Sequence, residues 1–227
     1  MVLESWLAMT EQKKRRPYSS ALRQGQAEAT RQRIAGAARE LMIRKGYADT
    51  TMAEVAREAG VALQTLYTSC PGGKPALAKL VYDITLAGDA RPLPQSDRPE
   101  VQAIIDEPDP LRKLARYAAM ATGILRRVQP VHRVLRSAAA ASPADAGLQE
   151  VLADIERERL KGSHGPAHHL HALGALRPGL TPARAAEQIY VLTSTENFEK
   201  LTEVCAWTEA EYEEWLAGIL AATLLQG

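Results

Sequence analysis

Apolar residues recur at intervals of three and four along this chain, and none of its apolar segments alternates as a β-strand would. The pattern predicts an all-α protein of about nine or ten helices. The first long helix is expected from about residue 27 to residue 45, ending at Gly46, with Ile34, Ala38, Leu41 and Met42 on its buried side.

Residues 46–77 contain two short helical patterns separated by a glycine. Thr51 followed by Glu54 forms a capping box, so the first short helix should begin at Met52. Gly60 supplies the positive φ that a steep helix–helix turn needs. Behind this turn, the outward positions carry small or hydrogen-bonding side chains suited to reading base edges: Ala62, Gln64, Thr65, Thr68 and Ser69. The segment therefore predicts a helix-turn-helix, although an alanine-rich helical hairpin could show the same offsets by chance.

The rest of the chain divides at a proline-rich stretch. A fourth helix is expected over about residues 75–88, and three prolines in residues 88–99 indicate a connecting loop. Beyond the loop, Asp109-Pro110, Ser142-Pro143 and Thr181-Pro182 each place a capping residue before a proline and so predict helix starts. We expect a basic, disordered N-terminal arm over residues 1–26, a helix-turn-helix DNA-binding domain over 27–88 and a larger helical-bundle domain for effector binding and dimerisation over 89–227, each of the two domains burying a core.

Charge is distributed unevenly between these parts. Residues 1–89 hold 13 Lys and Arg against 9 Asp and Glu, whereas residues 90–227 hold 15 against 18. The basic excess lies in the half that would meet DNA. Residues 10–26 are especially basic, through Lys13, Lys14, Arg15, Arg16 and Arg23, and are either a solvated tail or an arm that contacts phosphates or the minor groove.

Cysteine usage and the first residues bear on the compartment. Cys70 and Cys205 lie far apart in the sequence and fit a reducing cytoplasm, with Cys70 expected to be a small buried apolar residue. The first twenty residues have the pattern of neither a signal peptide nor a membrane span, so we expect a cytoplasmic protein with no membrane partner. Either Met1 or Met9 could be the initiator.

The N-terminal part resembles the TetR family of bacterial transcriptional regulators over about residues 27–88. The resemblance rests on an ordered series of residues: Thr30, Arg31, Ile34, Ala38, Leu41, Gly46, Tyr47, Thr50, Thr51, Val55, Ala56, Ala59 to Val61, Thr65 to Tyr67, Lys74 and Leu77. The chain departs from the family pattern at Cys70, where an aromatic residue is usual, and at Pro75, where an acidic residue is usual. The Pro71-Gly72-Gly73 stretch is also one residue longer than the common spacing.

This resemblance implies a homodimeric DNA-binding regulator, most simply a repressor that a small-molecule effector releases from a palindromic operator. It implies DNA contacts by Thr30, Arg31, Thr50, Thr51, Gln64, Thr65, Tyr67, Thr68 and Lys74. An activator or an effector-independent DNA binder with the same fold is the alternative. A helical enzyme is disfavoured because the sequence shows no catalytic grouping, phosphate loop or metal motif, and no cofactor is expected.

Two further sites are expected in the second domain. An effector pocket would involve Tyr117, Met120, Ile124 and His132, although an apolar stripe of this kind is more often plain core. The last two helices, the second opened by a capping box at Thr208 and Glu211, should form the dimer interface through Ile189, Thr193, Leu201, Trp215, Leu216, Ile219 and Leu220. His164, His168, His169 and His171 invite a metal interpretation, but Gly162, Gly165 and Pro166 should interrupt that helix, and we expect no metal site.

Overall fold

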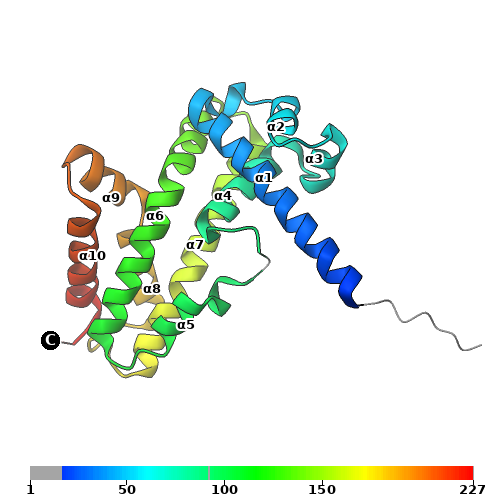
Figure 1. The fold of residues 1–227 in the computed structure, drawn as a ribbon. Helices are drawn as coiled ribbons and strands as arrows, with labels where there is room; N and C mark the ends of the chain where they lie inside the picture. The colour runs from blue at the N-terminus through cyan, green and yellow to red at the C-terminus, as the bar shows by residue number, and fades with distance from the viewer. Residues whose placement is uncertain (1–16, 92, 227) are drawn as a thin grey trace, which may run out of the picture.

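The structure is a computed structural model that describes residues 17–91 and 93–226, and it is helical with no β-strand among those residues (Figure 1). The prediction of an all-α fold is confirmed. No helix in the described part of the chain is both long enough and apolar enough to span a membrane. The elements are α1 (Pro17–Asp49), α2 (Met52–Glu58), α3 (Leu63–Ser69), α4 (Gly73–Ala87), a 3-10 turn η1 (Gln95–Asp97), α5 (Pro99–Ile105), α6 (Pro110–Ala141), α7 (Ala146–Ala172), α8 (Pro182–Leu192), α9 (Thr195–Glu199), a π-helical turn η2 (Lys200–Val204) and α10 (Glu209–Leu224).

Helix α1 starts earlier than the sequence pattern predicted. It begins at Pro17 rather than near residue 27, so residues 17–26 are helical, not an extended tail. Lys13, Lys14, Arg15 and Arg16 lie outside the described residues. The N-terminal half of α1 projects from the body of the protein beside α4 (Figure 1). At the other end Gly46, with φ of 87°, breaks the helix where the glycine predicted its end.

Helices α6 and α7 run the length of the molecule and take part in two hydrophobic clusters (Figure 1). The first cluster joins α1–α4 to the second half of α6 and the first half of α7, through Val128, Leu135, Leu148 and Ile155. The second joins the remainder of α6 and α7 to α8, α9 and α10. Each of the two domains therefore buries a core, and the core of the first continues into α6 and α7.

Two expected features around α7 are also wrong. Ser142-Pro143 does not start a helix: Ser142 ends α6, and α7 starts at Ala146 after Asp145, whose carboxylate accepts the Leu148 N–H at 3.0 Å. Gly162, Gly165 and Pro166 do not interrupt α7. Ala167 and Leu170, which follow the proline, are completely buried, so tertiary packing outweighs the low helix propensity there.

The helix that starts after Thr181 was expected to carry Ile189, Thr193 and Leu201, and the segment is instead divided. Helix α8 ends at Leu192, and Ser194 then caps α9 by accepting the Asn197 N–H at 3.2 Å. The apolar spacing would allow one continuous helix, but the cap at Ser194 stabilises a new helix start and so interrupts it. The capping box that starts α10, between Thr208 and Glu211, is confirmed.

Candidate functional site: a DNA-reading surface and an internal cavity

The helix-turn-helix forms as its sequence predicted. The Thr51 hydroxyl accepts the Glu54 N–H at 3.2 Å, and the Glu54 carboxylate accepts the Thr51 N–H at 3.1 Å, which confirms the capping box and the start at Met52. Gly60 has φ of 63°, and the Val61 N–H then donates to the Ala56 carbonyl at 2.9 Å. These local bonds set the angle at which α3 leaves α2.

Helix α3 presents a polar, exposed face at the edge of the molecule (Figure 1). Leu66 is fully buried and anchors the helix, while Gln64, Thr65, Tyr67 and Thr68 are exposed. Ser69, expected to point outward, is half-buried and donates to the Thr65 carbonyl at 3.0 Å. The remaining polar groups on α3 match the size and hydrogen-bonding capacity that readout of base edges in a major groove requires.

Lys74 lies at the start of α4 and has structural partners of its own. Its ammonium group donates to the Ala48 carbonyl at 2.7 Å and lies 4.5 Å from the centre of the Tyr47 ring. Partial burial lowers the pKa of Lys74, against the opposing effect of Asp145 and Asp49. Lys74 thus ties the start of α4 to the end of α1.

The other expected DNA contacts are less accessible than predicted. Thr50 is 1% exposed and donates to the Gly46 carbonyl at 2.8 Å, so its side chain faces inward to close the end of α1 rather than outward. Thr51 is exposed, but its hydroxyl belongs to the capping box. Thr30 and Arg31 are half-buried on α1, and Arg31 Nε is buried without a hydrogen-bond partner in the described part of the chain.

The unusual joint after α3 is compact. Cys70 is 1% exposed, as expected for a small apolar residue, and burial raises the pKa of its thiol. The Gly73 N–H donates to the Cys70 carbonyl at 2.9 Å, and Gly73 adopts φ of 68°. This turn accommodates the extra residue of the Pro71-Gly72-Gly73 stretch, and Pro75 falls in the first turn of α4, where its missing N–H needs no partner.

Behind the helix-turn-helix, helices α4, α6 and α7 line a partly open cavity of about 330 Å³. Tyr117, Met120 and Ile124, which the sequence suggested as pocket residues, line it. Tyr82, Asp83 and Leu86 of α4 form another wall, so the helix that follows the reader also borders the cavity. The rest of the lining is contributed by Gln95, Ala121, Leu125, Val128, Ile155, Glu158, Arg159, Gly162, Ser163, Thr193 and Thr195.

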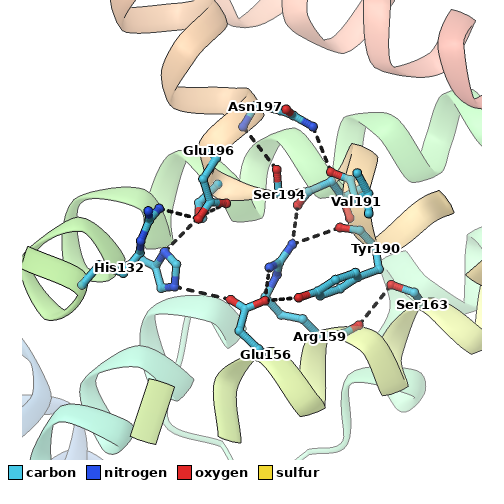
Figure 2. Close-up of polar contacts among 12 residues, drawn as sticks. His132, Glu156, Arg159, Ser163, Tyr190, Val191, Ser194, Glu196 and Asn197 are labelled. Carbon is cyan, nitrogen blue, oxygen red and sulfur yellow. Dashed lines mark hydrogen bonds and ion pairs between the residues drawn. The ribbon is translucent and has the colours of Figure 1, made fainter. Parts of the chain in front are cut away.

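His132 was expected to line the effector pocket, but it is not among the residues that line this cavity. It is buried beside the cavity, with Nδ1 2.8 Å from the Thr195 hydroxyl and Nε2 3.6 Å from the Glu156 carboxylate (Figure 2). Thr193, expected at the dimer interface, lines the cavity instead, because α8 ends at Leu192 and the chain turns inward.

Glu156 is the centre of the polar network around His132 (Figure 2). Its carboxylate also accepts the Tyr190 hydroxyl at 2.5 Å and Arg159 Nη1 at 2.7 Å. Burial would raise the pKa of Glu156, but hydrogen bonds from His132 and Tyr190 and the charge of Arg159 outweigh it and lower the pKa to about 2. Sequence reasoning missed Glu156 and Arg159 because they lie in a run of alternating charges that looks like a solvated helix face.

The residues expected at a dimer interface fall into two groups. Ile189, Leu216 and Leu220 are fully buried within their own chain, so they belong to the second hydrophobic cluster and not to an exposed surface. Leu201, Trp215 and Ile219 are half-buried. The outer side of α8 also exposes Val191, 57% accessible, which the sequence reading did not include.

The histidines of α7 do not assemble a metal site with other ligands. His164 and His168 have ring centres 6.2 Å apart, one turn from each other on a continuous helix. Among residues 17–91 and 93–226 no group of three or more His, Cys, Asp or Glu side chains is arranged to hold a metal ion.

Residues 34–69, which span the second half of α1 through α3, match the sequence model for bacterial regulatory proteins of the tetR family. This segment therefore carries the sequence signature of the tetR family. A comparison with curated protein sequences finds no match. The helix-turn-helix described above lies within the matched segment, so it is the DNA-binding element of the chain.

Solved structures show that the TetR fold extends over nearly the whole chain. A Rhodococcus sp. protein assigned to the family has a TM-score of 0.67 and 14% identity, covering 86% of this chain and 98% of its own. FadR of Bacillus subtilis, in complex with stearoyl-CoA, has a TM-score of 0.64 and 17% identity, covering 84% and 97%. NalD of Pseudomonas aeruginosa, the secondary repressor of the MexAB-OprM multidrug efflux pump, has a TM-score of 0.58 and 20% identity, covering 88% and 98%. At these identities the likeness establishes the fold.

Proposed function

We propose that the protein is a transcriptional repressor that binds a palindromic operator as a homodimer and leaves it when a small molecule enters the internal cavity. The observation that carries this proposal is the position of α4, which follows the reading helix in sequence and forms a wall of the cavity through Tyr82, Asp83 and Leu86. A ligand that changes this wall can thereby bias the position of the reader. Two of the structural neighbours support the idea: FadR was solved with stearoyl-CoA, and NalD is the secondary repressor of an efflux pump.

On the operator, Gln64, Thr65 and Thr68 would contact base edges and Tyr67 and Lys74 would contact phosphates. Base contacts select sequence, whereas phosphate contacts fix register and supply salt-dependent affinity. Arg31, Thr30 and Thr51 would add phosphate contacts after modest side-chain rearrangement. Thr50 would act only indirectly, since its inward hydroxyl closes the end of α1.

A dimer would bring two α3 helices to successive major grooves, which requires half-site centres about 34–36 Å apart. We propose that α8 and α10 form the contact. Ile189, Leu216 and Leu220 are buried and are excluded from this interface. The interface would instead comprise Val191, Trp215 and Ile219, with Leu201 at its margin. Sedimentation of the parent and of Ile219→Asp would test this, because a charge in an apolar contact should shift the protein toward monomer.

The function is tested by footprinting the DNA upstream of the protein's own gene. The proposal expects protection of a two-fold symmetric site whose halves are one helical turn apart, and loss of protection with some member of a metabolite panel. Transcription from that promoter should rise when the gene is deleted. A fall in transcription would instead favour the activator alternative, and protection that no metabolite reverses would favour an effector-independent DNA binder.

A further inference from the structure

A second hollow adjoins the internal cavity. It has a volume of about 440 Å³ and lies between α5 and α6. Gln95 and Met120 line both hollows, so the two meet at these side chains. The floor of this outer cleft is apolar, with Ala103, Ile104 and Ala119. A ligand longer than the inner cavity would reach the outer cleft past Gln95 and Met120.

The outer cleft carries arginines at its walls. Arg127 is half-buried and donates from Nε to the Thr85 carbonyl at 3.2 Å and from Nη2 to the Leu86 carbonyl at 3.0 Å. Burial and the neighbouring charge of Arg126 lower the pKa of Arg127. Within the described part of the chain, no carboxylate lies within ion-pair distance of Arg127. On the same side Arg116 is exposed and shares Glu107 with Arg112.

The acidic groups near the two hollows are placed differently. Asp83 and Glu158, at the α4–α7 side of the inner cavity, both bind Lys79, at 2.6 and 2.9 Å. Glu100 lines the outer cleft but is exposed on α5. Arg127 is thus more buried than Glu100. Its hydrogen bonds from Nε and Nη2 go to carbonyl oxygens, which do not neutralise its charge.

We propose, as an extension of the proposed effector-released function, that the effector is an amphipathic anion. Its apolar part occupies the inner cavity, and its acidic head group binds Arg127, with Arg116, in the outer cleft. Guanidinium groups suit such a head group because their forked donors pair with the oxygens of carboxylates and phosphates.

This placement also supplies the differential contact that release from DNA needs. Thr85 and Leu86 belong to the last turn of α4, so Arg127 holds that end of the helix through its free carbonyls. An acidic head group competes for the same donors. Binding of the head group then favours the state in which Arg127 no longer holds the end of α4. Because α4 directly follows the reading helix α3, this state can differ in the position of α3.

The proposal can be tested with three probes that share a ten-carbon tail: decanoate, decan-1-ol and decyltrimethylammonium. Titration calorimetry on the full chain should show decanoate binding about tenfold or more tighter than decanol, and the cationic probe binding most weakly. Arg127→Gln should reduce decanoate affinity about tenfold and leave decanol affinity unchanged. Arg126→Gln is the matched control, because Arg126 is adjacent but exposed and pairs with Glu209 at 3.5 Å.

Other results would overturn the assignment. These are equal affinities for the acid and the alcohol, tighter binding of the cation, no binding of any probe, or unchanged decanoate affinity in both Arg127→Gln and Arg116→Gln. Arg116 is exposed, so its variant keeps the test valid if Arg127→Gln fails to fold. Head-group-dependent binding that does not release operator DNA would uphold the anion site and refute effector-released repression, so the two proposals fail separately.

Discussion

Gly147, in the first turn of α7, lies so close to Pro75 of α4 that a Cβ atom at position 147 would be 2.7 Å from the proline Cγ. The proline ring has little freedom to move aside. The contact joins the second domain to the joint between the reading helix and α4, and it requires glycine for space rather than for backbone conformation.

We therefore expect Gly147→Ala to destabilise the protein, even though alanine is the better helix former. Overpacking of this kind costs about 1–3 kcal/mol, which for a chain of this size lowers the melting temperature by about 2–4 °C per kcal/mol. Gly165→Ala is the control, since nothing lies within 4 Å of a Cβ at that position of the same helix. It should stabilise by up to about 1 kcal/mol. Equal responses in thermal unfolding would show that the Pro75 contact is unimportant.

Gln64→Ala and Lys74→Ala should weaken DNA binding in different ways. Loss of a base contact at Gln64 should cost about 1–3 kcal/mol at one operator position and relax the preference there. Loss of a phosphate contact at Lys74 should weaken binding to all sequences and reduce the salt-dependence slope by about one. Binding isotherms on the operator and its single-base variants, at several salt concentrations, distinguish the two. Parent-like behaviour of both variants would place the reading surface elsewhere.

The two cysteines should differ in reactivity. Cys70 is buried and its raised pKa keeps it protonated, whereas Cys205 is exposed. Ellman's reagent at pH 8 should therefore titrate one thiol rapidly in the native protein and both in denaturant. Cys205→Ser should abolish the rapid phase and Cys70→Ser should retain it. A rapid phase that persists in Cys205→Ser would mean that the joint around Cys70 opens readily.

Glu156 should make stability depend on pH in the acid range. Its pKa is about 2 in the folded protein, below the ordinary glutamate value of 4.5, so the stability that it contributes is complete above about pH 5 and is lost as the pH falls toward 2. Glu156→Gln should lower the melting temperature by a few degrees at pH 7, and the difference from the parent should shrink by pH 3. The exposed Glu40 on α1 serves as a control through Glu40→Gln. A difference that stays constant from pH 7 to pH 3 would contradict the role of the ionised carboxylate.

The features that sequence reasoning identified correctly depend on few neighbouring residues. Each capping box, at Thr51 and at Thr208, joins a side chain to a backbone group three residues away. The turn at Gly60 depends on the backbone of that residue. Such short-range features can be recognised from the sequence alone. The exposed polar face of α3 followed from the same local geometry.

The sequence predictions that were wrong concern features that tertiary packing determines. Ser142-Pro143 and Asp145 are both acceptable helix starts, and the buried position of Leu148 accompanies the second. Nothing local distinguishes Leu216, buried in its own chain, from a residue that a partner would cover. His132 and Glu156 are 24 positions apart in the sequence and meet only because α6 and α7 pack together.

The hydrophobic cluster that crosses the 88–99 loop limits how such a regulator can be rearranged by recombination. Val128 and Leu135 of α6, and Leu148 and Ile155 of α7, complete the core beneath α1 and α4. A chimera that joined residues 17–88 to the ligand domain of another family member would expose this surface or fill it with mismatched side chains. Exchange of sensory specificity within this architecture therefore favours point changes around the cavity over the swapping of whole modules.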